Sequence, residues 1–216
     1  MPAGFWPGEE SSTLVPVEAQ IDDAVLMERY RDGDAAAFEL LYARHKGPLY
    51  RYLLRQCQPH EAAADVFQEV WSRVITSRDR YEVRAAFKTY LYRIAHHCVI
   101  DHYRLTSRKR ANRMDSLQDH EAVLSTQVHE QPEARVGHEQ LDRAFREALA
   151  GLPEEQRDVF LLFEEGGLGL KEIADITGVP AETVKSRLRY ALAKLRRALA
   201  DDFGMSTVLE PARAGS

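Results

Sequence analysis

Apolar residues recur three and four positions apart through most of the chain, the spacing that places them on one face of a helix. This period predicts a helix from Ala24 to a Gly33-Asp34 break, where Asp34 can cap the next helix. Further helices are predicted over 34–57 with an interruption at Gly47-Pro48, and over 59–75, 87–104, 138–150, 152–163, 170–177 and 182–199. No segment alternates with the period of two that a half-buried strand requires, so we expect an all-α fold.

Two long segments lack this period and are rich in polar or turn-forming residues. Residues 1–20 hold three prolines and two glycines, which is typical of a flexible tail. Residues 113–137 combine acids with Ser, Gln and Pro, a composition that favours a linker. We therefore expect two small helical domains, over 21–112 and 138–200, joined by an acidic linker and followed by a tail over 201–216.

The net charge of −5 conceals an uneven distribution of charges. Residues 101–113 hold five bases and one acid, residues 114–142 hold seven acids and one base, and residues 185–197 hold six bases and no acid. Clustered Lys and Arg indicate nucleic-acid binding, whereas a run of acids favours a solvated segment. The two basic segments therefore mark the predicted helices that are candidates for contact with nucleic acid.

Length and composition exclude several classes of protein. The 216 residues allow one or two domains, and 44% apolar residues are enough to form a core. No run of about 18 apolar residues predicts a membrane span, and residues 1–20 lack the basic start of a secretion signal. We therefore expect a cytoplasmic protein without membrane insertion. The two cysteines form no CxxC motif, and we expect both to be buried thiols.

Residues 170–192 have the spacing of a helix-turn-helix. Small Ala174 allows two helices to cross closely, and Gly178 suits the left-handed end of the first helix. The second helix begins with basic and hydroxyl side chains that can contact base edges and phosphates from a major groove. We expect duplex DNA to be contacted by Thr183, Val184, Lys185, Ser186, Arg187 and Arg189.

The predicted helix over 87–104 interleaves basic and aromatic side chains. Such a surface suits single-stranded DNA, because bases stack on rings while cations follow the phosphates. Taken alone, the pattern also fits a helix whose aromatic residues are core and whose charges are solvated. Its His96, His97, Cys98 and His102 lack the paired spacing of four zinc ligands, so no metal is expected. No HExxH, GxSxG or nucleotide-binding glycine motif occurs, so neither enzymatic activity nor a cofactor is expected.

Three stretches together resemble the small bacterial RNA polymerase sigma factors of the extracytoplasmic-function (ECF) type. They are Asp65-Val-Phe-Gln-Glu-Val-Trp71, then Phe87 to Ala95 with Asp101-His-Tyr-Arg104, and then Leu152-Pro153 through Gly178-Val179 to Thr183-Val-Lys-Ser-Arg187. The resemblance covers about residues 22–110 and 138–200. The family's usual Trp is Tyr90 here, which keeps a stacking ring. Its usual Asn is His97, which changes the hydrogen-bond donors.

The resemblance implies a role for each stretch. Asp65, Gln68 and Glu69 would bind core polymerase, and the helix-turn-helix would read the minus-35 promoter element. The minus-10 element would be read and melted by Arg80, Tyr81, Lys88, Tyr90, Arg93, His96, His97, Asp101, Arg104 and Arg108. The acidic linker would run toward the RNA exit path and the active-site cleft. The implied partners are bacterial core RNA polymerase, through its β′ clamp helices and β flap, promoter DNA and an anti-sigma factor.

Two other interpretations of the residues stay open. A free-standing helix-turn-helix regulator would account for residues 152–188 but would leave the motif at 65–69 and the aromatic helix unexplained. A protein-interaction module, such as an anti-sigma factor or adaptor, would need neither DNA nor the basic segment 185–197. Binding to core polymerase distinguishes a sigma factor from the regulator, and charge reversal at Arg187 and Arg189 tests the interaction module.

Overall fold

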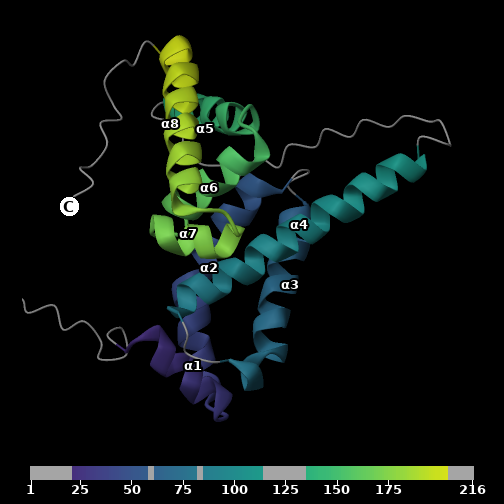
Figure 1. Cartoon of the computed structure of the whole chain (residues 1–216), viewed down its shortest axis with the longest axis vertical. Helices are drawn as coiled ribbons and strands as arrows, with labels where there is room; N and C mark the ends of the chain where they lie inside the picture. Colours follow the sequence, from purple (N-terminus) through teal and green to yellow (C-terminus); the bar gives the residue numbers. More distant parts are fainter. Residues whose placement is uncertain (1–20, 58–60, 82–84, 114–134, 204–216) are drawn as a thin grey trace, which may run out of the picture.

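The computed structural model describes residues 21–57, 61–81, 85–113 and 135–203, and in these residues every regular element is a helix (Figure 1). The N-terminal half contains α1 (Asp23–Arg31), α2 (Ala35–Gln56), α3 (Ala62–Thr76), the short 3-10 helix η2 (Arg78–Arg80) and α4 (Phe87–Arg113). The C-terminal half contains α5 (Arg135–Ala150), α6 (Glu154–Glu164), α7 (Leu170–Thr177) and α8 (Ala181–Phe203). The all-α prediction is confirmed. The predicted tail over 1–20, most of the predicted linker and residues 204–216 lie outside the described residues, whereas residues 201–203 of the other predicted tail continue α8.

The N-terminal half is a bundle in which α2 packs against α1 and α3, and α4 packs against α3 (Figure 1). Asp34 caps α2 as predicted, because its carboxylate accepts hydrogen bonds from the backbone N–H groups of Ala36 and Ala37 at 3.0 and 3.3 Å. The predicted apolar stripe of α3 is largely buried. Its Trp71 ring meets the Phe38 ring of α2 edge to face at 5.7 Å, so aromatic packing joins these two helices.

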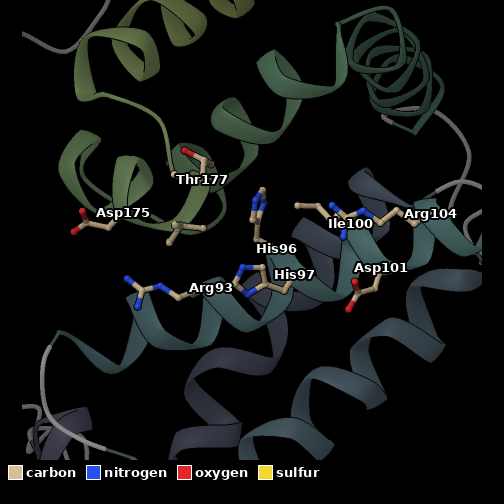
Figure 2. Close-up of a pocket in the computed structure, with 10 residues that line it drawn as sticks. Arg93, His96, His97, Ile100, Asp101, Arg104, Asp175 and Thr177 are labelled. Carbon is tan, nitrogen blue, oxygen red and sulfur yellow. The ribbon is translucent and has the colours of Figure 1, made fainter.

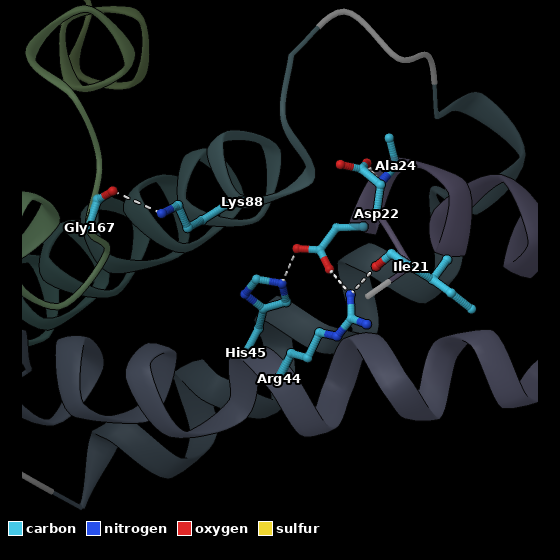
Figure 3. A network of polar contacts seen from close by, with 8 residues as sticks. Ile21, Asp22, Ala24, Arg44, His45, Lys88 and Gly167 are labelled. Carbon is cyan, nitrogen blue, oxygen red and sulfur yellow. Dashed lines mark hydrogen bonds and ion pairs between the residues drawn. The ribbon is translucent and has the colours of Figure 1, made fainter. Parts of the chain in front are cut away.

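A polar network fastens α1 to the middle of α2 (Figure 3). The Asp23 carboxylate lies 2.7 Å from Arg44 Nη1 and 2.6 Å from His45 Nε2, and Arg44 also donates to the carbonyl of Ile21 at 2.6 Å. Partial burial acts to raise the pKa of Asp23, but hydrogen bonds from His45 and Arg44 outweigh it and hold the pKa below its usual value. The His45 ring also lies 5.3 Å from the Phe87 ring, so the network supports the start of α4.

The predicted interruption at Gly47-Pro48 is wrong, because α2 continues through both residues without a break. A proline inside a helix removes one backbone hydrogen bond and costs about 3 kcal/mol. Leu41, Leu49 and Leu53 are fully buried on either side of Pro48, and each buried side chain of this size contributes roughly 1.5–3 kcal/mol. The packing of a continuous apolar face therefore outweighs the local cost of the proline.

The C-terminal half is a four-helix unit in which α7 and α8 form the predicted helix-turn-helix. Gly178 ends α7 with a φ of +70°, the left-handed conformation that glycine adopts without strain. At the other end of α7, the Glu172 carboxylate accepts a hydrogen bond from the backbone N–H of Gly169 at 2.8 Å. Val184 and Leu188 of α8 are buried, so a short helix with both ends satisfied is held against the longer α8.

The two halves pack directly against each other (Figure 1). α6 lies against α2, and α7 lies against α4. The buried apolar residues of both halves form one continuous cluster, so the halves share a core as well as a boundary. Among the described residues, no helix is long and apolar enough to cross a membrane.

Candidate nucleic-acid and polymerase interfaces

The first turns of α8 present basic side chains next to the turn of the helix-turn-helix. Five of the six predicted contacts are exposed or partly exposed, namely Thr183, Lys185, Ser186, Arg187 and Arg189. Lys185 and Arg187 lie 3.9 Å from Glu182 and Glu155, at the outer limit of an ion pair, so both cations can turn toward a phosphate. Val184, the sixth predicted contact, is fully buried, and the structure places it in the core.

α4 bears most of the side chains predicted to meet the minus-10 element. Arg93, His97 and Arg104 are exposed, and Lys88, Tyr90, His96 and Asp101 are partly buried. A cavity of about 510 Å³ runs between this surface of α4 and the C-terminal end of α7. Figure 2 shows Arg93, His97 and Arg104 along α4, below the end of α7 that bears Asp175 and Thr177. The side chain of Arg108 lies outside the described residues.

Aromatic residues at the start of α4 form a packed cluster with the end of α3. The Tyr81 and Tyr90 rings meet edge to face at 5.1 Å, and Tyr90 Oη lies 2.6 Å from the hydroxyl of Ser77. Tyr81 is 4% exposed, and burial raises the pKa of its hydroxyl. The structure therefore places Tyr81 in the core and Tyr90 at its edge, whereas Arg80 of η2 is exposed.

His97 is exposed on the part of α4 that lines the cavity. Partial burial of its ring, and then the neighbouring His96, lower the pKa of His97 below its usual value. A neutral imidazole offers one donor and one acceptor, so His97 can hydrogen-bond to a base edge at neutral pH. The next residue, Cys98, is buried, and among the described residues no group of three His, Cys, Asp or Glu could hold a metal ion.

Asp65, Gln68 and Glu69 are exposed together on α3, opposite its buried stripe. Glu69 Oε1 accepts a hydrogen bond from Arg73 Nε at 2.7 Å, and Arg73 Nη2 also reaches Asp101 of α4 at 3.3 Å. Two carboxylates and an amide therefore share one surface that is suited to a basic or hydrogen-bonding partner.

Sequence reasoning missed a buried polar cluster between the two halves. Asp158 of α6 is 6% exposed, and its Oδ1 accepts hydrogen bonds from Tyr52 Oη at 2.8 Å and from Gln56 Nε2 at 2.7 Å. Its Oδ2 lies 2.9 Å from His96 Nδ1 of α4. Burial, and then the charge of Asp158, raise the pKa of Tyr52 well above its usual value. Tyr52 and Asp158 are 106 positions apart, so no local spacing could have revealed this cluster.

Further hydrogen bonds tie α4 to the C-terminal half. Lys88 Nζ donates to the carbonyl of Gly167 at 2.8 Å (Figure 3), and Thr89 Oγ1 donates to Glu172 Oε1 at 2.5 Å. The hydrogen bond from Thr89 is the largest influence on Glu172 and lowers the pKa of its carboxyl. Part of the surface predicted to contact DNA is therefore occupied by the C-terminal half.

Comparisons with known proteins agree with these features. The family model described as Sigma-70 region 2 matches residues 41–109, and the one described as Sigma-70, region 4 matches residues 142–195. The chain is 30% identical over 176 residues to the ECF RNA polymerase sigma-E factor of Haemophilus influenzae, over 78% of this chain and 90% of that protein. It is 28% identical over 182 residues to the ECF RNA polymerase sigma factor SigW of Bacillus subtilis, over 81% of this chain and 95% of that protein.

Two solved structures share the fold. CnrH, in complex with the cytosolic domain of CnrY, matches with a TM-score of 0.59 and 25% identity over 83% of this chain and 98% of that chain. The sigma factor RpoE of Bartonella quintana, in complex with the anti-sigma factor NepR, matches with a TM-score of 0.61 and 21% identity over 76% of this chain and 98% of that chain. The chain belongs to the ECF sigma factors of the sigma-70 family, which are not enzymes, and it directs RNA polymerase to promoters.

Proposed function

We propose that this ECF sigma factor uses three separate surfaces for its contacts in transcription initiation. The exposed face of α3 binds core polymerase, the exposed side of α4 meets the melted minus-10 element, and the start of α8 reads the minus-35 element. The domains are residues 21–112 and 138–200, with 113–137 as the linker. The observation that supports this division is the distribution of exposed side chains, with acids and an amide on α3 and bases on α4 and α8.

On α3, the polymerase contact consists of Asp65, Gln68 and Glu69, which meet the clamp helices of the β′ subunit. Their positions one turn apart let all three side chains reach one partner surface. The hydrogen bond from Arg73 holds the Glu69 carboxylate in place, so less freedom is lost on binding. The C-terminal half makes the second polymerase contact, with the β flap.

At the minus-10 element, α4 combines ring stacking with cations. Tyr90, held by Ser77, offers a ring to an unstacked base. Arg93 and Arg104 follow the phosphates, and His97 hydrogen-bonds to a base edge. Tyr81 is buried and its ring packs against the ring of Tyr90, so its role is to hold Tyr90 in position. The other members of this surface are Arg80, Lys88, His96, Asp101 and Arg108.

At the minus-35 element, the start of α8 enters the major groove of duplex DNA. Arg187 and Arg189 can each bond the edge of a guanine, and Lys185 can pair with a phosphate. Thr183 and Ser186 add hydroxyl groups that hold the backbone. Val184 contributes by fixing the helix to the core of the C-terminal half, because its side chain is buried.

The test of the polymerase contact is the affinity of the purified chain for bacterial core RNA polymerase, measured by biolayer interferometry. The triple variant Asp65→Ala, Gln68→Ala, Glu69→Ala should bind about tenfold more weakly or worse, a loss of about 1.4 kcal/mol or more. Glu39→Ala removes an exposed acid from α2 and should leave the affinity unchanged. Undiminished binding by the triple variant would assign the polymerase contact to another surface.

We further propose that an anti-sigma factor binds the free protein in the cytoplasm, where polymerase acts. The solved complex of RpoE, which shares this fold, with the anti-sigma factor NepR supports this partner. The tagged chain, purified from its native cells, should elute with a bound protein that added core polymerase displaces. Size-exclusion chromatography would detect this exchange, and a partner that stays bound alongside polymerase would contradict an anti-sigma role.

A further inference from the structure

The strongest feature without a role is the Asp158 cluster, which consists of Tyr52, Gln56, His96 and Asp158. Arg157, the residue beside Asp158, extends it by donating from Nε to Gln56 Oε1 at 3.1 Å. Tyr52 and Gln56 come from α2, His96 from α4 and Asp158 from α6. Tyr52, Gln56 and Asp158 are all less than 9% exposed, so hydrogen bonds across the boundary between the halves replace the water that these groups would otherwise bind.

Such a cluster specifies one arrangement of the two halves. A buried carboxylate is costly unless every lone pair that faces the protein is matched by a donor. Asp158 finds its donors only on α2 and α4 among the residues that the structure describes. A shift of α6 would leave Asp158 and Tyr52 buried without partners, whereas complete separation would return all of them to water. The cluster therefore favours a two-state choice between docked and separated halves.

The docked state covers the three proposed surfaces unequally. On α4 it engages Lys88 through the carbonyl of Gly167, and it engages His96, whose side chain is 13% exposed, through Asp158. Figure 2 shows His96 pointing from α4 toward the C-terminal helices. The exposed residues of α3 and the first turns of α8 lie outside this contact, since Glu69 and Lys185 keep 52% and 66% of their side-chain surface exposed.

We propose that the Asp158 cluster is an intramolecular latch, which docks the C-terminal half on α4 and withholds Lys88 and His96 from the minus-10 strand. The latch leaves the α3 surface and the start of α8 free. Its effect on promoter DNA rests on the proposed role of α4 at the minus-10 element. Breaking the latch therefore raises affinity for a single strand without changing the surface that binds duplex DNA.

The first test of the latch measures how accessible His96 is to a chemical reagent in the free full-length chain. Diethyl pyrocarbonate acylates accessible imidazoles, and mass spectrometry can compare His96 with the exposed His97 beside it. In the unmodified sequence His96 should react about tenfold more slowly than His97, because the closed form dominates. Asp158→Ala should bring the two rates within about twofold, and Glu164→Gln, at an exposed acid on the same helix, should change neither rate.

Tyr52→Phe gives a second variant that keeps its ring against Tyr92, at 5.4 Å, and removes only the hydroxyl that binds Asp158. It should raise the His96 rate in the same direction by a smaller factor, and circular dichroism would confirm that both variants remain helical. Unchanged His96 rates in both folded variants would overturn the latch. A His96 rate that already equals that of His97 in the unmodified sequence would overturn it as well.

The consequence for DNA is measured with a fluorescein-labelled, mixed-sequence single strand of about 15 nucleotides. Asp158→Ala should bind it about tenfold more tightly than the unmodified chain, while affinity for a mixed-sequence duplex stays the same. If His96 is modified faster but single-strand affinity does not rise, the cluster still docks the two halves. The proposal that docking withholds α4 from DNA would then be overturned. Binding to core polymerase, which the proposed function assigns to the α3 surface, is measured in a separate experiment. It therefore tests the proposed function independently of the latch.

Discussion

The two long basic helices, α4 and α8, differ in what covers their charged side chains. On α8, Lys185 keeps 66% of its side-chain surface exposed, whereas on α4 His96 keeps 13% and Lys88 is bonded to Gly167. In sequence the two helices look alike, each with bases beside an apolar stripe. The difference teaches that a charge pattern identifies a helix able to bind DNA, while the packing of the other half decides which of its side chains are available.

The cause is the number of faces that each helix buries. α8 packs mainly against α5, α6 and α7 of its own half, through a single stripe formed by Val184, Leu188, Ala191 and Leu195. α4 packs against α1, α2 and α3 and also against α7. Its Tyr92 is buried and donates a hydrogen bond to the carbonyl of Glu165 at 3.2 Å. A helix shared by two halves has fewer positions left for a nucleic acid.

The largest effect is expected from reversing charge on α8. Arg187→Glu combined with Arg189→Glu should weaken binding to a mixed-sequence DNA duplex about 100-fold at low salt, because two cations on the surface that meets the duplex become anions, which the phosphates repel. The slope of log affinity against log salt should fall by about 2. Fluorescence anisotropy across a salt series measures both quantities.

The matched control for this pair is Arg93→Glu combined with Arg104→Glu, which reverses two exposed charges on α4. It should change duplex affinity by less than about twofold and should reduce affinity for a single strand. Equal loss of duplex affinity from both pairs would mean that net charge, and not the position of the bases on α8, governs duplex binding.

Replacing Val184 tests whether α8 separates core positions from DNA positions. Val184→Ala should cost about 2 kcal/mol of stability, because it removes two buried methyl groups and leaves a small cavity. Urea unfolding measures this cost, and duplex affinity of the folded variant should stay unchanged. Thr183→Ala, at the partly exposed neighbour, should show the opposite pattern of unchanged stability and weaker binding. Full stability with lost affinity in Val184→Ala would make Val184 a DNA contact.

Much of the fold followed from local signals in the sequence. The cap at Asp34, the left-handed end at Gly178 and the buried stripe of α3 each depend on residues within one or two turns, and each was predicted. Pro48 was misread because its local cost is outweighed by burial that involves other helices. Helix ends were also approximate, since α4 continues to Arg113 beyond the predicted end at 104.

The candidate site was less predictable than the fold. The exposure of Asp65 and Arg189 follows from helical periodicity alone. Helical spacing could not show that Tyr81 would be buried, because its burial comes from packing with Phe87 and Tyr90 of α4. The partners of Asp158 lie on two helices more than 60 positions away in the sequence, and only the docking of one half on the other brings them together.

A fall in pH should weaken the contact between α4 and α7 through Glu172 of α7, which accepts the hydrogen bond from Thr89 of α4. The pKa of Glu172 lies below its ordinary value of 4.5, so this stabilisation is complete above about pH 4.5 and is lost as the pH falls through the lower folded pKa. Thr89→Val keeps the shape and removes the donor, and should cost at most about 1 kcal/mol at pH 7.

Urea unfolding at several pH values measures this difference, which should shrink toward zero as the pH falls below the lowered pKa of Glu172 and its carboxyl becomes protonated in both proteins. A titration of the Glu172 carboxyl by NMR should show its pKa rising toward 4.5 in Thr89→Val. A stability loss that does not depend on pH would mean that Thr89 acts through packing alone.

The smallest effect is expected at Ser77, which connects the end of α3 to the stacking ring of α4. Ser77→Ala removes the hydrogen bond to Tyr90 Oη and should cost about 0.5–1 kcal/mol of stability. Affinity for a single strand should fall about twofold, because the ring is free to turn away from its stacking position, while duplex affinity through α8 stays unchanged. Tyr90→Phe removes the same hydrogen bond from the other side and should match the loss of single-strand affinity, but it should cost less stability, because Ser77→Ala also removes the hydrogen bond from Ser77 Oγ to the carbonyl of Arg73. Because Ser77→Ala already removes the hydrogen bond that Tyr90→Phe breaks, the double variant should lose no more than Ser77→Ala alone, and additive losses would mean that Ser77 does not act through Tyr90.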